Sequence, residues 1–234
     1  FLAKIASDWR KPDGLFVIAD LSGAGSTACQ TALYAESGQH TSYSRLATDP
    51  GGENAIVMFK SCYPNSNLSG SPTDGPSATP GYTVGHAKYV YQTLLTGFAQ
   101  HPDKLFVVIT APPVLDPTYA ANARAFNQWL VNDWLRQADY AVGNVAVFDF
   151  YNVLTSNGGG PDTNDLGATA GNHHRWRNGA EQHVCDDGGN VSAYATAGDD
   201  HPGRAGSLKA TGEFVPMLNV FYHRWQAALA ARGH

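Results

Sequence analysis

The sequence predicts a doubly wound, three-layer α/β domain with a mostly parallel sheet. Strand-like and helix-like segments alternate along the chain, the strand-like segments are apolar throughout, and the helix-like segments have one apolar face. Strands that are buried on both faces read as continuous apolar runs, and such strands are typical of parallel sheets covered by helices. We expect a single domain over residues 1–234, because this length fits one α/β domain and no linker or internal repeat is visible.

The first third of the chain is predicted to begin with a strand at 15–19 and a helix at 26–36. The stretch LFVIADLSGAGSTA (15–28) runs from apolar residues into a glycine-rich turn and then into helix-compatible sequence. Glycine suits such a tight strand-to-helix turn because it tolerates positive φ. A short second strand is expected at 40–48.

The middle of the chain predicts two further strands, at 55–59 and 105–110. A long loop rich in Pro, Gly and Ser follows the first of them at 63–82. Thr83 is expected to cap a helix at 84–99. The apolar residues of that helix recur at helical spacing: Ala87, Val90, Tyr91, Leu94, Leu95 and Phe98.

The last part of the chain predicts a helix at 121–136, a strand at 145–150 and a final helix at 207–231. The segment 155–200 has little periodicity and is expected to be irregular. The buried face of the final helix is predicted from its apolar residues: Phe214, Val215, Leu218, Phe221, Tyr222, Trp225 and Leu229.

The composition argues against several partners. The net charge is −5 and no basic run is present, so we expect no nucleic-acid partner. No apolar stretch approaches the roughly 18–20 residues of a membrane span, so none is predicted. Charged residues form 15% of the chain, against about 25% in typical globular domains. A polar but weakly charged surface favours a secreted or extracellular protein, or a periplasmic one.

The three cysteines, Cys29, Cys62 and Cys185, fit no zinc-binding spacing. We expect either buried thiols or one disulfide with a spare thiol. In the second case Cys62–Cys185 is the expected pair, because both residues lie in loop-like sequence.

A histidine with acidic neighbours stands just before the last predicted helix. In GDDHPGRAG (198–206), Asp199 and Asp200 precede His201. A general base needs an imidazole whose second nitrogen is held by a carboxylate, and an Asp one or two residues away can hold it through a turn. Ligands of doubly wound sheets bind at the carboxyl ends of the strands, and polar residues that follow earlier strands are Ser22, Ser61 and Asn65.

The order of these segments resembles the SGNH (GDSL-type) hydrolase superfamily. The segments IVMFKSCYPNSNL, KLFVVITAPP and DDHPGRAG are also similar to an uncharacterised bacterial branch of that superfamily. The resemblance covers nearly the whole chain in the order and type of its elements. It implies a flavodoxin-like sheet of the SGNH-hydrolase type.

The resemblance implies a serine nucleophile and its base. Ser22 would attack the substrate, His201 would accept its proton, and Asp199, or failing that Asp200, would hold the imidazole. The implied reaction is hydrolysis of an ester through an acyl-enzyme, with O-acetyl groups on a glycan as the expected substrate.

The resemblance also implies groups that surround the reacting atoms. The backbone N–H of Ser22, together with Asn65 or Ser61, would stabilise the oxyanion. No cofactor and no metal are expected. Sugar rings stack on aromatic faces, and the side chains expected to contact a glycan are Tyr63, His173 and Trp176.

Two other functions stay open. The chain reads Ala19-Asp20-Leu21-Ser22 where the superfamily has Gly-Asp-Ser, so the domain could have lost activity and serve in binding, homo-oligomerisation or extracellular self-assembly. Dinucleotide binding is the less favoured function. Gly23, Gly25 and Ala28 match the G-x-G-x-x-[GA] loop, but the chain shows no convincing acidic residue at the end of the second strand, about 20 residues on.

A metal site is the remaining alternative. Possible ligands gather between residues 171 and 201, among them His173, His174 and His183. They include no i, i+4 pair on a predicted helix, and adjacent histidines are expected to point in different directions. We therefore expect a hydrogen-bonded loop packed over the ends of the sheet.

Overall fold

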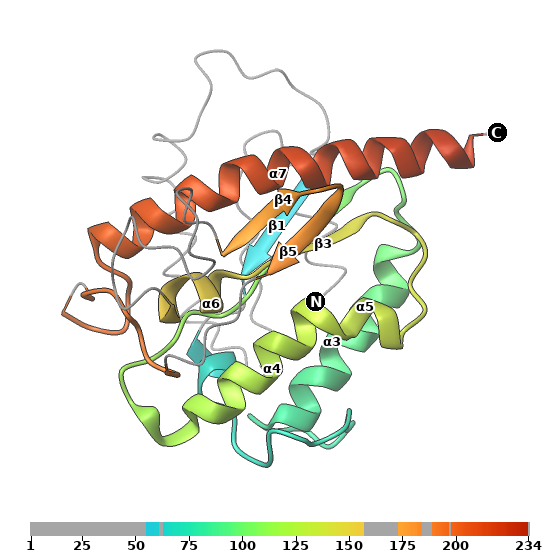
Figure 1. Cartoon of the computed structure of the whole chain (residues 1–234). Coiled ribbons are helices and arrows are strands. Elements are labelled where there is room, and N and C mark those ends of the chain that lie inside the picture. Colours follow the sequence, from blue (N-terminus) through green and yellow to red (C-terminus); the bar gives the residue numbers. More distant parts are fainter. Residues whose placement is uncertain (1–54, 61–62, 157–172, 184–188, 197, 234) are drawn as a thin grey trace, which may run out of the picture.

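The structure is a computed structural model (Figure 1). It describes residues 55–60, 63–156, 173–183, 189–196 and 198–233. The predicted elements at 15–19, 26–36 and 40–48 lie outside these residues, and so do the three cysteines.

A three-stranded parallel sheet forms the centre of the described chain. Its strands are β1 (Ile56–Lys60), β2 (Leu105–Ile109) and β3 (Val145–Phe148), in the order β1-β2-β3. Both neighbouring pairs are parallel. The prediction of an α/β fold with a parallel sheet is confirmed.

The helix between β1 and β2 is α3 (Val84–Phe98), which closely matches the predicted range. It begins after Thr83, whose hydroxyl accepts a hydrogen bond from the His86 backbone N–H at 3.1 Å. Thr83 therefore caps the helix as predicted, and satisfies one of the N–H groups that have no partner within the first turn.

The connection between β2 and β3 contains two helices, α4 (Ala120–Asn132) and α5 (Trp134–Gln137). The sequence predicts one continuous helix at 121–136, and this is wrong at Asp133, where φ is −120° and the helix ends. The chain turns at Asp133, and α5 begins at Trp134.

The longest helix, α7 (Arg204–Arg232), extends the predicted range at both ends. Val215 and Tyr222 were expected on its buried face, but they are 59% and 39% exposed. None of the described helices, this one included, is long and apolar enough to cross a membrane. The residues that α7 buries lie on one face of the helix: Gly206, Lys209, Ala210, Glu213, Met217, Phe221 and Trp225.

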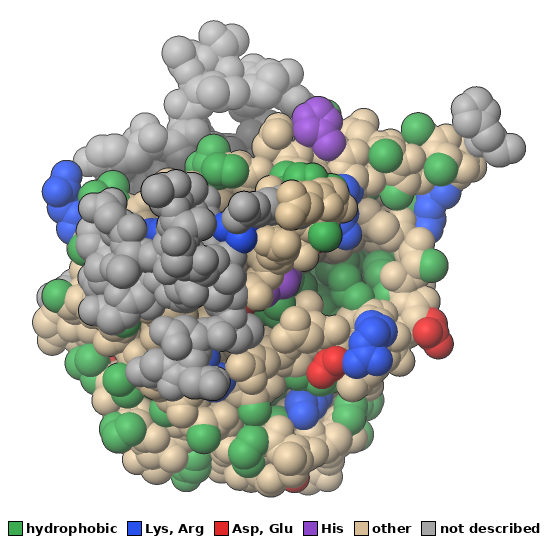
Figure 2. Space-filling view, viewed as in Figure 1, with side chains coloured by type: hydrophobic (Ala, Val, Ile, Leu, Met, Phe, Trp, Pro, Cys, Tyr) green, Lys and Arg blue, Asp and Glu red, His purple; other side chains and the backbone are tan. Residues whose placement is uncertain are grey.

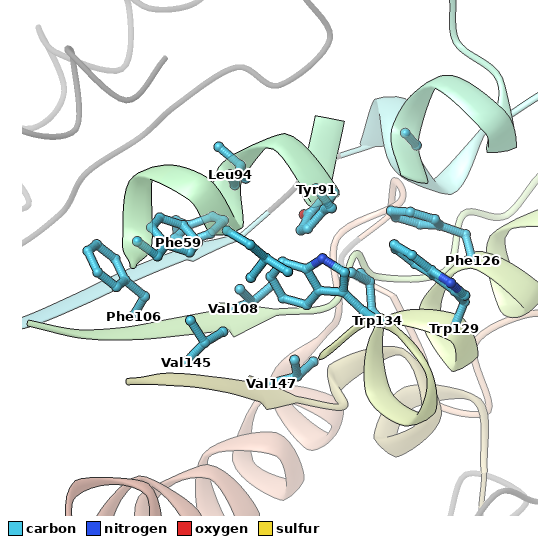
Figure 3. Packing of buried hydrophobic residues seen from close by; sticks show 14 of the residues in the cluster. Phe59, Tyr91, Leu94, Phe106, Val108, Phe126, Trp129, Trp134, Val145 and Val147 are labelled. Carbon is cyan, nitrogen blue, oxygen red and sulfur yellow. The ribbon is translucent and has the colours of Figure 1, made fainter. Parts of the chain in front are cut away.

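Alternate side chains of the sheet enter two separate cores. Phe106 of β2, aligned with Val57 and Val145 on the neighbouring strands, packs with the apolar residues of α3 and α4. Figure 3 shows this core. The centroids of the Trp134 and Tyr91 rings are 5.4 Å apart. The intervening residues of the strands form a second core with α7. Helices therefore cover both faces of the sheet.

The strand predicted at 145–150 is shorter than expected. It ends at Phe148, and Asp149 caps the following helix, α6 (Phe150–Thr155), by accepting a hydrogen bond from the Asn152 backbone N–H at 3.2 Å. Two short 3-10 helices are also present: η1 (Tyr63–Ser66) and η2 (Pro117–Tyr119).

A β-hairpin lies within the segment predicted to be irregular. Strands β4 (His174–Arg177) and β5 (Ala180–His183) pair in antiparallel fashion. Asn178 and Gly179 form the turn, with φ values of 55° and 74°. Asn-Gly is the preferred pair for a two-residue turn with positive φ. The prediction of an irregular segment is therefore wrong here, and the Asn178-Gly179 pair is the sequence signal that indicates the hairpin.

Candidate functional site

The segments that follow β1 and β2 are joined at the carboxyl edge of the sheet. The Ser66 hydroxyl donates a hydrogen bond to the Pro112 carbonyl, and both residues are buried. Thr110 accepts a hydrogen bond from the Tyr151 backbone N–H at 2.8 Å, which joins the end of β2 to α6. The edge where parallel sheets bind ligands is thus held by buried polar contacts.

The side chains of Asp199 and His201 are in contact just before α7. The His201 Nδ1 lies 3.0 Å from Asp199 Oδ2, and the His201 backbone N–H donates to Asp199 Oδ1 at 2.8 Å. Both side chains are exposed, at 61% and 63%. The hydrogen bonds from His201 lower the pKa of the Asp199 carboxyl, so the carboxylate that holds the imidazole stays ionised in moderately acidic solution.

The neighbouring Asp200 has a different contact. Its Oδ1 accepts a hydrogen bond from the Leu115 backbone N–H at 2.7 Å, which ties the turn at 198–203 to the segment after β2. The Gly203 backbone N–H also donates to the Ala195 carbonyl at 3.0 Å. The turn that carries His201 is therefore fixed at two places, and Asp199 is the carboxylate that touches the imidazole.

The predicted nucleophile and oxyanion groups are described only in part. Ser22 and Ser61 lie outside the described residues. Asn65 is in η1, directly after β1, and its side chain is buried. It lines a small surface hollow together with His86 and Tyr91 of α3. The role of these residues stays a prediction.

The predicted substrate contacts differ in their exposure. Trp176 of β4 is 46% exposed. His173 is buried, and its Nδ1 lies 3.1 Å from Glu213 Oε1 of α7. The side chain of Tyr63 lies outside the described part of the structure. Of the two side chains that the structure describes, only that of Trp176 has its ring at the surface.

The hairpin brings together His174 and His183, which the sequence offers as possible metal ligands, and Glu181, which it does not single out. His174 and His183 are paired across the two strands, and Glu181 lies two residues before His183, so all three are on one face. Glu181 Oε1 is 2.8 Å from His174 Nε2 and 3.3 Å from His183 Nε2. Arg224 of α7 donates to the other oxygen of Glu181. We call His174, Glu181 and His183 the hairpin cluster.

The environment of the hairpin cluster determines the protonation of His174 and Glu181. Burial lowers the pKa of His174, and the Asp149 backbone N–H donates to its Nδ1 at 3.3 Å, so the ring is neutral and carries its proton on Nε2. Burial alone would raise the pKa of Glu181, but hydrogen bonds from the two histidines outweigh this and hold its pKa below the usual range. Glu181 is therefore a carboxylate.

A buried carboxyl group completes this region. Asp149 Oδ2 lies 4.0 Å from His183 Nδ1. Burial raises the pKa of Asp149, and the nearby histidines oppose that shift. The sequence signal that could have found this region is the Asn178-Gly179 turn, because its register aligns His174 with His183.

The face of the molecule in Figure 2 carries scattered charges. Figure 2 shows scattered Lys, Arg, Asp and Glu side chains on one face and no continuous basic patch among the described residues. This agrees with the charged fraction of 15%. When the chain is compared with models of known families, with curated proteins and with solved structures, no match is found.

Proposed function

We propose that this protein is a serine esterase in which His201 is the general base and Asp199 holds its imidazole. The observation that supports this proposal is the 3.0 Å contact between His201 Nδ1 and Asp199 Oδ2. Such a contact fixes the tautomer of the imidazole and leaves Nε2 to accept a proton. The turn is bound through Asp200 to the segment after β2, near the edge where parallel sheets bind ligands.

The reaction uses Ser22 as the nucleophile. Its Oγ forms a bond to the acyl carbon while His201 takes the hydroxyl proton. The bond from the acyl carbon to the alcohol oxygen then breaks, and His201 gives the proton to the departing alcohol. Water attacks the acyl-serine with the same base, which releases the acid and restores Ser22. The Ser22 backbone N–H, with Asn65 or Ser61, stabilises the oxyanion in both halves.

The proposed substrate is an O-acetylated glycan outside the cell. The exposed indole of Trp176 supports this choice, because sugar rings stack on aromatic faces and Trp176 is 46% exposed. The low charge of the surface agrees with a neutral substrate. No cofactor is needed for this chemistry.

Hydrolysis of p-nitrophenyl acetate tests the proposal. His201→Ala is expected to lower kcat/KM by at least about 100-fold, which is the usual contribution of a general base. Ser22→Ala is expected to remove burst-phase acylation. His223→Ala is the matched control, because His223 is an exposed histidine of α7, and it should leave the rate unchanged.

The competing function is a domain that binds or self-associates without turnover. Equal rates for wild type, His201→Ala and His223→Ala would show that surface imidazoles alone hydrolyse the reagent, and would refute the proposal. A loss of rate in His201→Ala alone, with an unchanged circular dichroism spectrum, would support it.

A further inference from the structure

Two of the three separations between the donor atoms of the hairpin cluster are close to those of a tetrahedral metal site. Candidate ligand atoms of His174, Glu181 and His183 all lie within 4.8 Å of one another. Glu181 Oε1 is 3.3 Å from His183 Nε2 and 2.8 Å from His174 Nε2. With zinc–ligand bonds of about 2.0–2.1 Å, neighbouring ligand atoms of a tetrahedral ion are about 3.3 Å apart. One of these separations already fits, and the other must open slightly.

We propose that the hairpin cluster binds one divalent ion of the zinc class. Two imidazoles and one carboxylate suit zinc, and three protein ligands leave a fourth position for water. Glu181 and His183 are 21% and 14% exposed at their side chains, so an ion can reach the cluster from solvent. This proposal is independent of the esterase proposed at His201.

The surrounding residues support metal binding. A histidine that binds a metal commonly donates its other ring N–H to a carboxylate. Asp149 Oδ2 stands 4.0 Å from His183 Nδ1, and this nitrogen is buried with no hydrogen-bond partner among the described residues. Movement of the His183 ring onto a metal through Nε2 would let Nδ1 donate to Asp149. The ion would therefore give a partner to a nitrogen that otherwise has none in the described structure.

The backbone around the hairpin cluster holds the ligands in register. Glu213 of α7 accepts hydrogen bonds from the backbone N–H groups of His173 and His174, at 2.9 and 3.0 Å. The cross-strand pairing aligns His174 with His183. Both imidazoles are thus presented from a hairpin that is fastened to the helix behind it.

Metal binding requires several small local rearrangements. In the structure the Asp149 backbone N–H donates to His174 Nδ1 at 3.3 Å, which leaves the ring proton on Nε2. A metal on Nε2 replaces that proton, and a neutral ring then carries its proton on Nδ1. The long hydrogen bond from Asp149 must open, and the two imidazole rings, with centroids 4.0 Å apart, must separate. We therefore expect weaker binding than at a fully preformed site.

Titration with zinc and cobalt tests the proposal. The full chain is treated with a chelator, dialysed and titrated with Zn²⁺ by calorimetry and with Co²⁺ by visible absorption. One ion per chain is expected to bind, with cobalt absorption typical of tetrahedral nitrogen and oxygen ligands and without a thiolate charge-transfer band. Zn²⁺ should also raise the unfolding temperature, because it binds the folded state.

Variants then locate the site. Glu181→Gln and His183→Ala are each expected to abolish the cobalt absorption, and Asp149→Asn should weaken Zn²⁺ binding by about 10- to 100-fold, as loss of an outer carboxylate does elsewhere. The controls His201→Ala and His223→Ala should bind like wild type. Far-UV circular dichroism checks the fold, and Glu181→Gln changes little in shape. Absence of saturable binding, or wild-type binding by Glu181→Gln and His183→Ala, would overturn the proposal.

Discussion

At the scale of single residues, the Glu213 carboxylate is the buried group that requires the most hydrogen-bond partners. It accepts hydrogen bonds from the backbone of His173 and His174, and it also meets His173 Nδ1 and Lys209 Nζ, both at 3.1 Å. A buried charge is tolerated only when hydrogen bonds and an opposite charge replace its water. Glu213 has both, and it thereby fastens the hairpin to α7.

Removal of this carboxylate should be costly. Glu213→Ala is expected to lower the free energy of unfolding by about 3–5 kcal/mol, because it removes the buried acceptor of the His173 and His174 backbone N–H groups and its contact with Lys209. Urea denaturation measures the change. Asp139→Asn, which neutralises an exposed carboxylate and keeps a residue type that tolerates its positive φ, should stay within about 0.5 kcal/mol of wild type. A loss below about 1 kcal/mol for Glu213→Ala would contradict the buried role.

Tyr151 predicts how stability depends on alkaline pH. Burial raises the pKa of Tyr151 to about 12, whereas tyrosine in an unfolded chain titrates near 10. Its hydroxyl donates to the Asn190 carbonyl at 2.8 Å. The unfolded state therefore loses its proton first, so the stability that this shift contributes is complete below about pH 10 and is lost as the pH rises to about 12.

The loss should be on the order of 2 kcal/mol between those pH values. Unfolding free energies measured across this range should fall less steeply in Tyr151→Phe than in wild type. Tyr82→Phe, which removes the hydroxyl of an exposed tyrosine, should leave the slope unchanged. Equal slopes for wild type and Tyr151→Phe would count against the buried position of this hydroxyl.

At the scale of secondary structure elements, substitution of two glycines by alanine is expected to change the stability in opposite directions. Gly179 in the hairpin turn has φ of 74°, and Gly212 lies inside α7; a Cβ added at either would meet nothing within 4 Å. Gly179→Ala should destabilise by about 1–2 kcal/mol because of its backbone conformation, while Gly212→Ala should stabilise by about 0.5–1 kcal/mol. Thermal unfolding of both variants tests this, and equal signs would contradict the assigned conformations.

The sequence predicts elements best where their signals are local. Apolar runs and helical spacing identify the three strands and α3, and Thr83 marks the start of that helix. Asp149 also caps a helix, but it directly follows four apolar residues, so the apolar pattern predicts a strand that continues through it. The break at Asp133 could not be predicted, because the helical apolar spacing continues across it into Trp134.

At the scale of the whole molecule, the two proposed sites differ in how far apart their residues lie in the sequence. Asp199 and His201 are two residues apart, so the sequence alone suggests their contact. The three side chains of the hairpin cluster are brought together by the turn at 178–179 and by the cross-strand register. Arg224 of α7 then donates a hydrogen bond to Glu181. A single sequence carries no signal for that last contact, which joins residues 43 positions apart.

Both proposed sites are attached to the same helix, α7, at different positions along it. The sheet has a core on each face, and α7 covers one face while it follows directly on the turn that carries His201. The hairpin is fastened to the same helix through Glu213. Damage to one site should therefore leave the other testable, provided that α7 remains folded.

Covalent labelling tests the proposed esterase most directly. The protein is incubated with a fluorophosphonate, which reacts with serine nucleophiles that are activated by a base, and the adduct is located by mass spectrometry of peptides. We expect a single adduct on Ser22, and a labelling rate that falls at least about 100-fold in His201→Ala but not in His223→Ala. No adduct on Ser22, or labelling that does not depend on His201, would contradict the proposal.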